Sequence, residues 1–283
     1  MARINRADAL INQALVIESE SAQDAGSLGF MARAMVQATL PHKAVKGNEF
    51  IRKNGNYSLT IMSPSAVGLP YGSIPRLLLA WVTTEALRTD SRELELGDSM
   101  SAFMAELGLS RQGSNIASLK TQTRRLFASS IWATYKDRDK VIDTNYRLAD
   151  QAVLWWGAKS PDQAGLWKSE VILSQPFFDE IKQHPIPVDM RALHALKRSP
   201  LALDIYMTLT HRASYQTKTS VIPWSGLAMA FGSDYAELRN FKTAFIAELK
   251  KVVTVYGAIR VNILPEGLEI RPSLTHISRK PKA

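Results

Sequence analysis

The first forty residues show two different patterns of apolar and polar positions. Residues 1–24 mix charged, serine and amide side chains with weak periodicity, which predicts an arm or a marginal helix. Over residues 25–40 apolar side chains recur at helical spacing, at Leu28, Met31, Met35 and Val36. A helix is therefore predicted there, and Pro41 ends it because proline cannot continue the helical hydrogen bonds.

A β-hairpin is predicted next, over Phe50–Ile61. Two strand-like runs flank Asn54-Gly55. Asn-Gly adopts positive φ at low cost, as a type I′ turn between twisted strands requires.

The pattern then changes to an ordered series of helices and strands. A long helix begins at Ser73, and the short strand Arg92–Leu96 alternates polar and apolar residues. Asp98 is placed to cap a second helix, and Ser114–Ser130 forms a third. A hairpin over Ile131–Tyr146 follows. This order is typical of a winged helix-turn-helix.

The same order recurs about 125 residues later, a period that indicates two copies of one module. The second copy has a helix over 201–209, a strand over 219–223 and a short helix over Trp224–Phe231. The helix Tyr235–Val253 and a hairpin over 259–271 complete it.

The predicted fold is α+β and helix-rich, with two tandem winged-helix domains. The predicted divisions are an N-terminal arm and helix at 1–45, a β-hairpin at 46–66, a first winged-helix domain at 67–175, and a second with a basic C-terminal tail at 176–283.

The third helix of each copy presents an unusual outer face. Large apolar residues such as Leu119 and Leu126, or Leu238 and Phe241, fall on the inner side. The opposite side carries small residues with Arg, Lys and Asn, which suits entry into a major groove about 12 Å wide. The candidate DNA-binding residues are Arg111, Ser114, Ser118, Lys120, Thr121, Arg124 and Arg125 in the first copy, and Arg239, Asn240, Lys242, Thr243 and Lys250 in the second.

The charge balance agrees with a polyanionic partner. The chain has 35 Lys and Arg against 26 Asp and Glu, a formal net charge of +9. It contains no cysteine, and its longest apolar run, Leu77–Val82, is far too short to span a bilayer. We therefore expect a soluble intracellular protein without a membrane partner.

The sequence does not carry the usual signatures of catalysis. No two of the five histidines have metal-ligand spacing, and neither a phosphate-binding loop motif nor a nucleophile elbow is present. A nicking enzyme would need metal ligands near its tyrosine nucleophile, and Tyr135 and Tyr146 have no histidine pair nearby. We expect a binding protein rather than an enzyme, with no metal and no cofactor.

Three segments resemble RepA-type plasmid replication initiator proteins. They are Gly68-Leu69-Pro70-Tyr71-Gly72-Ser73-Ile74-Pro75-Arg76-Leu77-Leu78-Leu79-Ala80-Trp81, Ser91-Arg92-Glu93-Leu94 with Leu96-Gly97, and Arg124-Arg125-Leu126-Phe127. The resemblance implies a plasmid-associated protein of the bacterial cytoplasm that binds repeated double-stranded sequences at the plasmid origin. It also implies origin opening and recruitment of the host replication initiator and replicative helicase.

The resemblance further implies a dimer–monomer equilibrium, in which a dimer represses the protein's own promoter and contributes to copy control. The N-terminal half, including the hairpin Phe50–Ile61, is the expected site of that association. The alternative function is a sequence-specific transcriptional repressor without a replicative role, which the sequence does not separate from an initiator.

Overall fold

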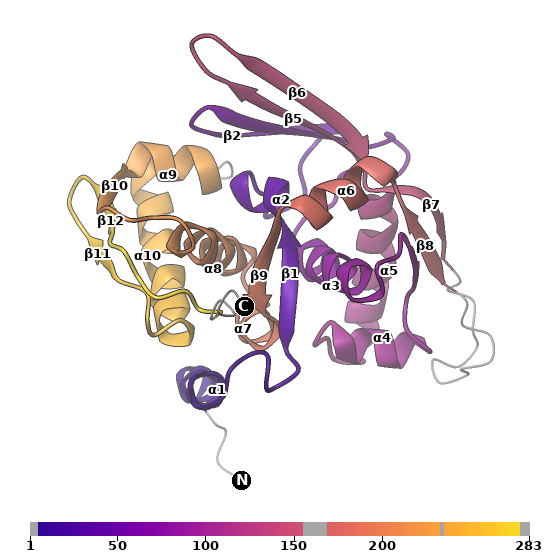
Figure 1. Cartoon of the computed structure of the whole chain (residues 1–283), viewed down its shortest axis with the longest axis horizontal. Coiled ribbons are helices and arrows are strands. Elements are labelled where there is room, and N and C mark those ends of the chain that lie inside the picture. Colours follow the sequence, from indigo (N-terminus) through magenta and orange to yellow (C-terminus); the bar gives the residue numbers. More distant parts are fainter. Residues whose placement is uncertain (1–4, 155–168, 233–234, 278–283) are drawn as a thin grey trace, which may run out of the picture. The chain divides into compact units, whose positions relative to one another are not determined.

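A computed structural model describes residues 5–154, 169–232 and 235–277 of the chain (Figure 1). The chain forms two units. Residues 32–185 make up one, called here the central unit, and residues 1–31 together with 186–283 make up the other, called the terminal unit. These limits differ from the predicted divisions, because the N-terminal helix packs on elements near the C-terminus instead of forming a separate arm.

An antiparallel sheet of four strands occupies one side of the central unit. Its order is β2 (Glu49–Asn54), β3 (Tyr57–Met62), β5 (Ser130–Lys136) and β6 (Val141–Arg147). Both predicted hairpins are present, and β3 joins them by pairing Ile61 with Ile131.

The turn of the first hairpin differs from the prediction by one residue. Asn54 pairs with Tyr57, so the two-residue turn is Gly55-Asn56 and not Asn54-Gly55. Gly55 has a φ of +59°, and Asn56 has a negative φ, which excludes the type I′ turn because that turn needs positive φ at both central positions.

The helices of the central unit are α2 (Arg33–Gln37), α3 (Ser73–Thr89), α4 (Met100–Glu106), α5 (Gly113–Phe127) and α6 (Gln175–Gln183). Helix α3 packs against α5 and α6 and buries most of its residues. The cap of α4 is Ser99, whose hydroxyl accepts from the backbone N–H of Ala102 at 3.1 Å, and not the predicted Asp98. Gly108, with a φ of +65°, follows the end of α4 as predicted.

The arginine of the Leu-Pro-Tyr-Gly motif has a structural role. Arg76 is only 3% exposed, and its guanidinium donates to the carbonyls of Leu40 at 2.7 Å and Gly72 at 2.6 Å. It therefore ties the start of α3 to the segment that follows α2.

A second sheet of the central unit has the order β4 (Glu93–Glu95), β8 (Glu170–Leu173) and β7 (Ala149–Val153). The prediction treated the hairpin after α5 as the wing of the first domain. That hairpin, β5–β6, instead joins β2 and β3, and the strand that pairs with β4 is β8. Strand pairing of this kind depends on segments far apart in sequence, which the local pattern does not specify.

The terminal unit begins with α1 (Arg6–Ser19), in the segment predicted as an arm or marginal helix. The helix predicted over 25–40 is wrong in its first half: residues Leu28–Ala32 form the strand β1, which pairs with β9 (Pro185–Asp189), and only α2 is helical. Burial alternates along β1, as expected for a strand, and Met31 is 1% exposed.

The rest of the terminal unit follows the predicted order. It contains α7 (Met190–Leu196), α8 (Pro200–Ala213), β10 (Ser220–Pro223), α9 (Trp224–Phe231), α10 (Leu238–Val255), β11 (Val261–Ile263) and β12 (Gly267–Ile270). The three strands form one antiparallel sheet in the order β10-β12-β11. Its core is aromatic, with Tyr206, Phe241, Phe245 and Tyr256 fully buried.

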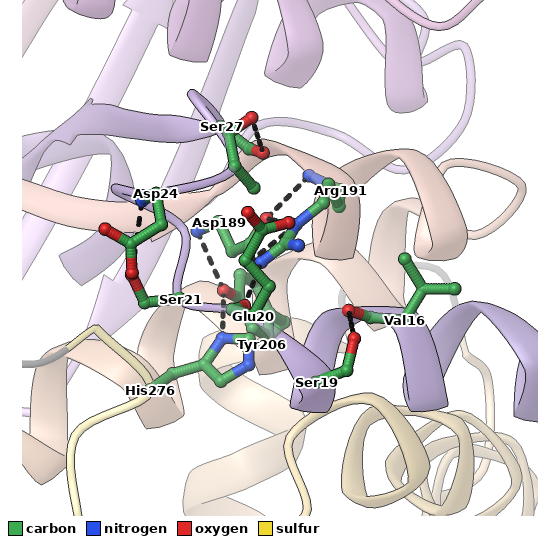
Figure 2. Close-up of polar contacts among 11 residues, drawn as sticks. Val16, Ser19, Glu20, Ser21, Asp24, Ser27, Asp189, Arg191, Tyr206 and His276 are labelled. Carbon is green, nitrogen blue, oxygen red and sulfur yellow. Dashed lines mark hydrogen bonds and ion pairs between the residues drawn. The ribbon is translucent and has the colours of Figure 1, made fainter.

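A polar network lies inside the terminal unit (Figure 2). The backbone N–H of Asp189 donates to the Tyr206 hydroxyl at 3.1 Å, and that hydroxyl lies 2.7 Å from Nδ1 of His276. Arg191 forms an ion pair with Asp189 at 2.8 Å and donates to the carbonyl of Glu20 at 2.9 Å. The network thereby connects α8 and β9 to the end of α1 and to the C-terminal segment.

Candidate nucleic-acid interface

Helix α5 separates its inner and outer faces as the periodicity predicts. Leu119, Thr123, Leu126 and Phe127 are buried against the central unit. Ser114, Ser118, Thr121 and Arg124 are exposed, and Ala117 lies among them. No acidic residue occurs in the helix, so its outer face carries small side chains and positive charge.

Two neighbouring arginines of α5 have different surroundings. Arg124 is exposed, whereas Arg125 is half-buried. The Nε of Arg125 donates to the carbonyl of Val67 at 3.1 Å, and its guanidinium lies 5.3 Å from the ring centre of Tyr71. Arg125 therefore holds the loop before α3, and Arg124 is the one directed to solvent.

A buried amide also fixes α5, and the sequence reasoning missed it. Gln122 is 5% exposed, and its Oε1 accepts the backbone N–H of Tyr71 at 2.9 Å. Tyr71 thus contacts two residues of α5, both through the motif that precedes α3. A glutamine among the inward-facing residues of α5 is the signal that could have revealed this contact.

Two further candidates lie at or near α5. Arg111 is exposed just before the helix, and Lys120 is half-buried on its flank. Both make polar or electrostatic interactions within the protein. Together with Arg124 they place positive charge along the margin of the α5 outer face.

Helix α10 of the terminal unit has the same division. Phe241, Phe245, Leu249 and Val252 are buried. The residues on the outer face are exposed: Arg239, Asn240, Thr243, Ala247 and Lys250. Leu238, predicted to face inward, is instead 49% exposed because it is the first residue of the helix and precedes the packed part.

The polar groups of the α10 outer face are partly engaged. Arg239 forms an ion pair with Glu237 at 2.5 Å, although its side chain remains 82% exposed. The Thr243 hydroxyl donates to the carbonyl of Arg239 at 3.0 Å, so its proton is already hydrogen-bonded within the helix. Asn240 has an exposed side chain, which is the group that can read an adenine edge.

Lys242 is half-buried and is held by the neighbouring helix and turn. Its Nζ lies 4.8 Å from the ring centre of Trp224 and 3.4 Å from the carbonyl of Pro265. Trp224 in turn donates from Nε1 to the carbonyl of Leu264 at 3.1 Å, so α9, α10 and the β11–β12 turn support one another.

The predicted site residues therefore form two sets on two units. Those from Arg111 to Arg125 lie on or just before α5 in the central unit, and those from Arg239 to Lys250 lie on α10 in the terminal unit. The exposed members that belong to each helix share one face of it, and Arg111 lies just before α5.

Within the described ranges, His, Asp and Glu do not gather in groups of three that would hold a metal ion. None of the helices in that part of the chain combines the length and apolar character that a membrane span requires.

The fold is similar to crystal structures of domains 2 and 3 of RctB. A selenomethionine derivative of these domains gives a TM-score of 0.55 at 12% identity and covers 82% of this chain and 94% of that chain. The fragment RctB-155-483 gives a TM-score of 0.51 at 11% identity, covering 84% and 96%. At such low identity the likeness concerns the fold alone, which in this chain is a helix-rich α+β architecture.

The evidence for the protein family is in the amino-acid sequence. Residues 69–225, more than half of the chain, match the model of the family described as plasmid encoded RepA protein. The chain belongs to this family, which confirms the resemblance to RepA-type plasmid replication initiators. The matched region begins at Leu69, the first residue of the Leu-Pro-Tyr-Gly motif, and includes all of α5. No curated protein is significantly similar to the chain in sequence.

Proposed function

We propose that this RepA-family protein starts plasmid replication by binding repeated double-stranded sequences at the plasmid origin through two winged-helix domains. The observation that carries the proposal is the pair of helices α5 and α10. Each follows a helix, a short strand and a second helix, and each has an exposed face of small and basic residues.

The topology of the terminal unit supports one winged-helix domain. Its order is α8, β10, α9, α10, β11, β12, and the first strand pairs with the last. In this arrangement α10 is the recognition helix and β11–β12 is the wing.

The topology of the central unit supports the second. Its order is α3, β4, α4, α5. The strand order β4-β8-β7 in its sheet corresponds to the order β10-β12-β11 in the terminal unit. The proposed wing is therefore β7–β8. The β5–β6 hairpin is an addition that belongs to the four-stranded sheet.

The two outer faces provide groups for both kinds of contact with DNA. Arginine makes bidentate contacts with guanine and asparagine with adenine, while a threonine methyl group contacts the thymine methyl. We assign base contacts to Arg124 and Thr121 on α5, and to Asn240 and Thr243 on α10. Ser114, Ser118, Arg111, Lys120, Arg239 and Lys250 are assigned to phosphates, which set the register of the helix.

Arg125 and Lys242 receive a different assignment from the other candidates. Both are half-buried and already bound to carbonyl groups of their own unit. We propose that they position α5 and α10, and that they act on DNA binding through the placement of these helices.

A nuclease footprint on DNA that flanks the gene tests the proposal. Protection of several direct repeats beside an A·T-rich segment is expected for an initiator. The footprint is recorded at near-physiological salt, because low salt inflates nonspecific binding. A single protected inverted repeat over a promoter would favour the alternative, a repressor without a replicative role.

A replication assay separates the two functions directly. A vector without an origin receives the gene and its flanking DNA, and stable maintenance in the host contradicts a plain repressor. Loss of maintenance in an Arg124→Ala variant, with maintenance kept in Arg88→Ala, would connect replication to the α5 face. Arg88 is a suitable control because it is exposed on α3 and paired with Glu85.

We also propose that the protein forms dimers through the four-stranded sheet, and that the dimer represses the protein's own promoter. The face opposite the core exposes Ile51 and Trp132, which flank Thr60 on neighbouring strands, together with Met62. Exposed apolar side chains on adjacent strands are typical of an interaction surface. This extends the expected site of association from the hairpin Phe50–Ile61 to the whole sheet.

Origin opening and recruitment of the host initiator and helicase belong to the same proposal and rest on family membership. We propose that all these steps are non-enzymatic. Incubation of the protein with supercoiled origin DNA and Mg²⁺ is expected to leave the DNA unnicked. A covalent protein–DNA adduct would overturn this part of the proposal and restore the nicking enzyme.

A further inference from the structure

A cavity of about 400 Å³ lies in the central unit between its four-stranded sheet and helices α2 and α6. It is on the sheet face opposite the exposed Trp132. Its wall includes three tyrosines, Tyr57, Tyr135 and Tyr146, and the charged residues Arg33 and Glu180. The volume is within the range of small-molecule sites, of which the smallest are about 300 Å³.

Buried polar groups in this cavity lack hydrogen-bond partners within the described part of the chain. Tyr146 is 8% exposed, and its hydroxyl is buried and unpartnered. The Nε of Arg33 is also buried without a hydrogen bond, although it lies 3.7 Å from Oε1 of Glu180. An unpaired buried polar group costs about 1–3 kcal/mol, so a bound molecule that supplies the partner would recover that energy.

The proton positions of the cavity follow from its environment. Burial raises the pKa of Tyr57 and of Tyr146 well above the usual value for a phenol, so both keep their protons at neutral pH. Tyr57, Tyr146 and the Arg33 Nε are therefore hydrogen-bond donors. Glu180 provides carboxylate oxygens that accept, and one of them lies next to the Arg33 donor.

The rings at the site have separate roles. Tyr146 lines the cavity and packs on Phe177, with ring centres 5.9 Å apart, so one face of its ring is covered. Tyr135 pairs with Tyr57 across the strands, and 39% of its surface is exposed. Tyr135 can therefore stack on a planar ligand that enters the cavity.

We propose that this cavity binds a single unpaired nucleobase of the keto type, thymine or guanine. Such a base has a ring N–H beside a carbonyl oxygen. The N–H donates to Glu180, the carbonyl accepts from the Tyr146 hydroxyl, and the ring stacks on Tyr135. Adenine and cytosine present an acceptor where the keto bases present the ring N–H, which leaves the Glu180 carboxylate facing a lone pair.

Two sources supply a keto base, a free nucleotide and a single strand of DNA. Equilibrium dialysis of the full-length protein with dTMP, dGMP, dAMP and dCMP tests the first. Fluorescence anisotropy with labelled oligothymidylate and oligoadenylate of equal length tests the second. Retention of mononucleotides indicates a free nucleotide, and binding of oligothymidylate alone indicates a strand. Either result with the keto preference supports the proposal.

Tyr146→Phe is the decisive variant because it removes only the unpartnered hydroxyl and keeps the ring on Phe177. Binding of the keto ligand is expected to weaken about fivefold, the effect of one hydrogen bond. Thermal stability should stay the same or rise, since an unpaired buried hydroxyl is lost. Tyr215→Phe, at a tyrosine 58% exposed in the terminal unit, is the matched control and should bind as the parent does.

Glu180→Gln tests the base preference, since an amide can both donate and accept and should reduce the discrimination between thymine and adenine. No binding of any nucleotide or oligonucleotide, equal binding of all four bases, or unchanged binding by Tyr146→Phe would overturn the proposal. Binding to duplex repeats is measured in parallel. Duplex binding depends on α5 and α10. Loss of duplex binding would therefore contradict the proposed function, whereas the nucleobase site is judged only by the binding of nucleotides and single strands.

Discussion

The hydroxyl of Tyr206 connects the core of the terminal unit to its C-terminal segment through His276. Because that oxygen accepts the backbone N–H of Asp189, its own proton is available for Nδ1 of His276, which lies 2.7 Å away. Donation to Nδ1 goes with an imidazole proton on Nε2, whereas an Nδ1–H donates to the Tyr206 oxygen, so either neutral tautomer satisfies the pair. The Tyr256 hydroxyl adds a second tie, donating to the carbonyl of Leu274 at 2.7 Å.

Stability of the terminal unit is expected to fall in mild acid. Burial lowers the pKa of His276, Arg191 lowers it further and Asp189 opposes the shift, so the folded protein binds fewer protons there than the unfolded chain. The stability from neutral His276 is complete above its unfolded pKa of about 6.5 and is lost as pH falls from there toward the folded pKa. The free energy of unfolding in urea, measured at pH 7.5 and 5.5, gives this loss of stability. A His276→Gln variant should show a smaller difference between the two pH values, and an undiminished difference would exclude His276 as its source.

The two arginines at the end of α5 should differ in their effect on stability. Arg124→Ala is expected to weaken binding to a specific duplex by about 1–3 kcal/mol and to leave the thermal midpoint unchanged, since Arg124 is exposed. Arg125→Ala removes the contacts with Val67 and Tyr71 and should lower stability by about 1 kcal/mol. Anisotropy and thermal unfolding of both variants distinguish these roles. If Arg124→Ala binds normally, α5 is not a recognition helix.

Gly267 is required by the close approach of β12 to β10. A Cβ atom there would lie 2.1 Å from the backbone carbonyl oxygen of Ile222, which cannot move without separating the strands. Gly267→Ala should therefore destabilise the terminal unit by about 2–3 kcal/mol. Gly257→Ala is the control, because nothing lies within 4 Å of its Cβ position. Denaturant midpoints of the two variants check the prediction, and equal midpoints would contradict it.

A charge on the open face of the four-stranded sheet should weaken self-association. Trp132 is 41% exposed on that face, and Trp132→Lys is expected to raise the dimer dissociation constant at least tenfold, because a buried lysine would lose its hydration. Met229→Lys, at a residue 54% exposed on α9, provides a control of equal charge. Sedimentation equilibrium measures the dimer dissociation constant of both variants. A Trp132→Lys protein that dimerises like the parent would place the interface elsewhere.

The apolar pattern was sufficient for the long helices and for the hairpins whose two strands are adjacent in sequence. Helices α3, α5, α8 and α10 and the hairpins β2–β3, β5–β6 and β11–β12 occur where the periodicity predicts them. The buried side of α5 was also predictable, since Leu119 and Leu126 fall on one stripe and the stripe faces the core. The family came from the sequence as well, because its motif is a continuous run of residues.

Only the tertiary structure decided how the strands combine and which polar groups are engaged. Residues Leu28–Ala32 have helical spacing of apolar side chains, yet they form β1 because they pair with β9, a partner too far along the chain for the local pattern to show. Likewise β4 pairs with β8 and not with the nearer β5–β6 hairpin. Periodicity specifies which face of an element is buried but carries no information about the partner that buries it. For the same reason Arg124 and Arg125 look alike in sequence, and only the loop at Val67, packed against α5, separates a surface arginine from a structural one.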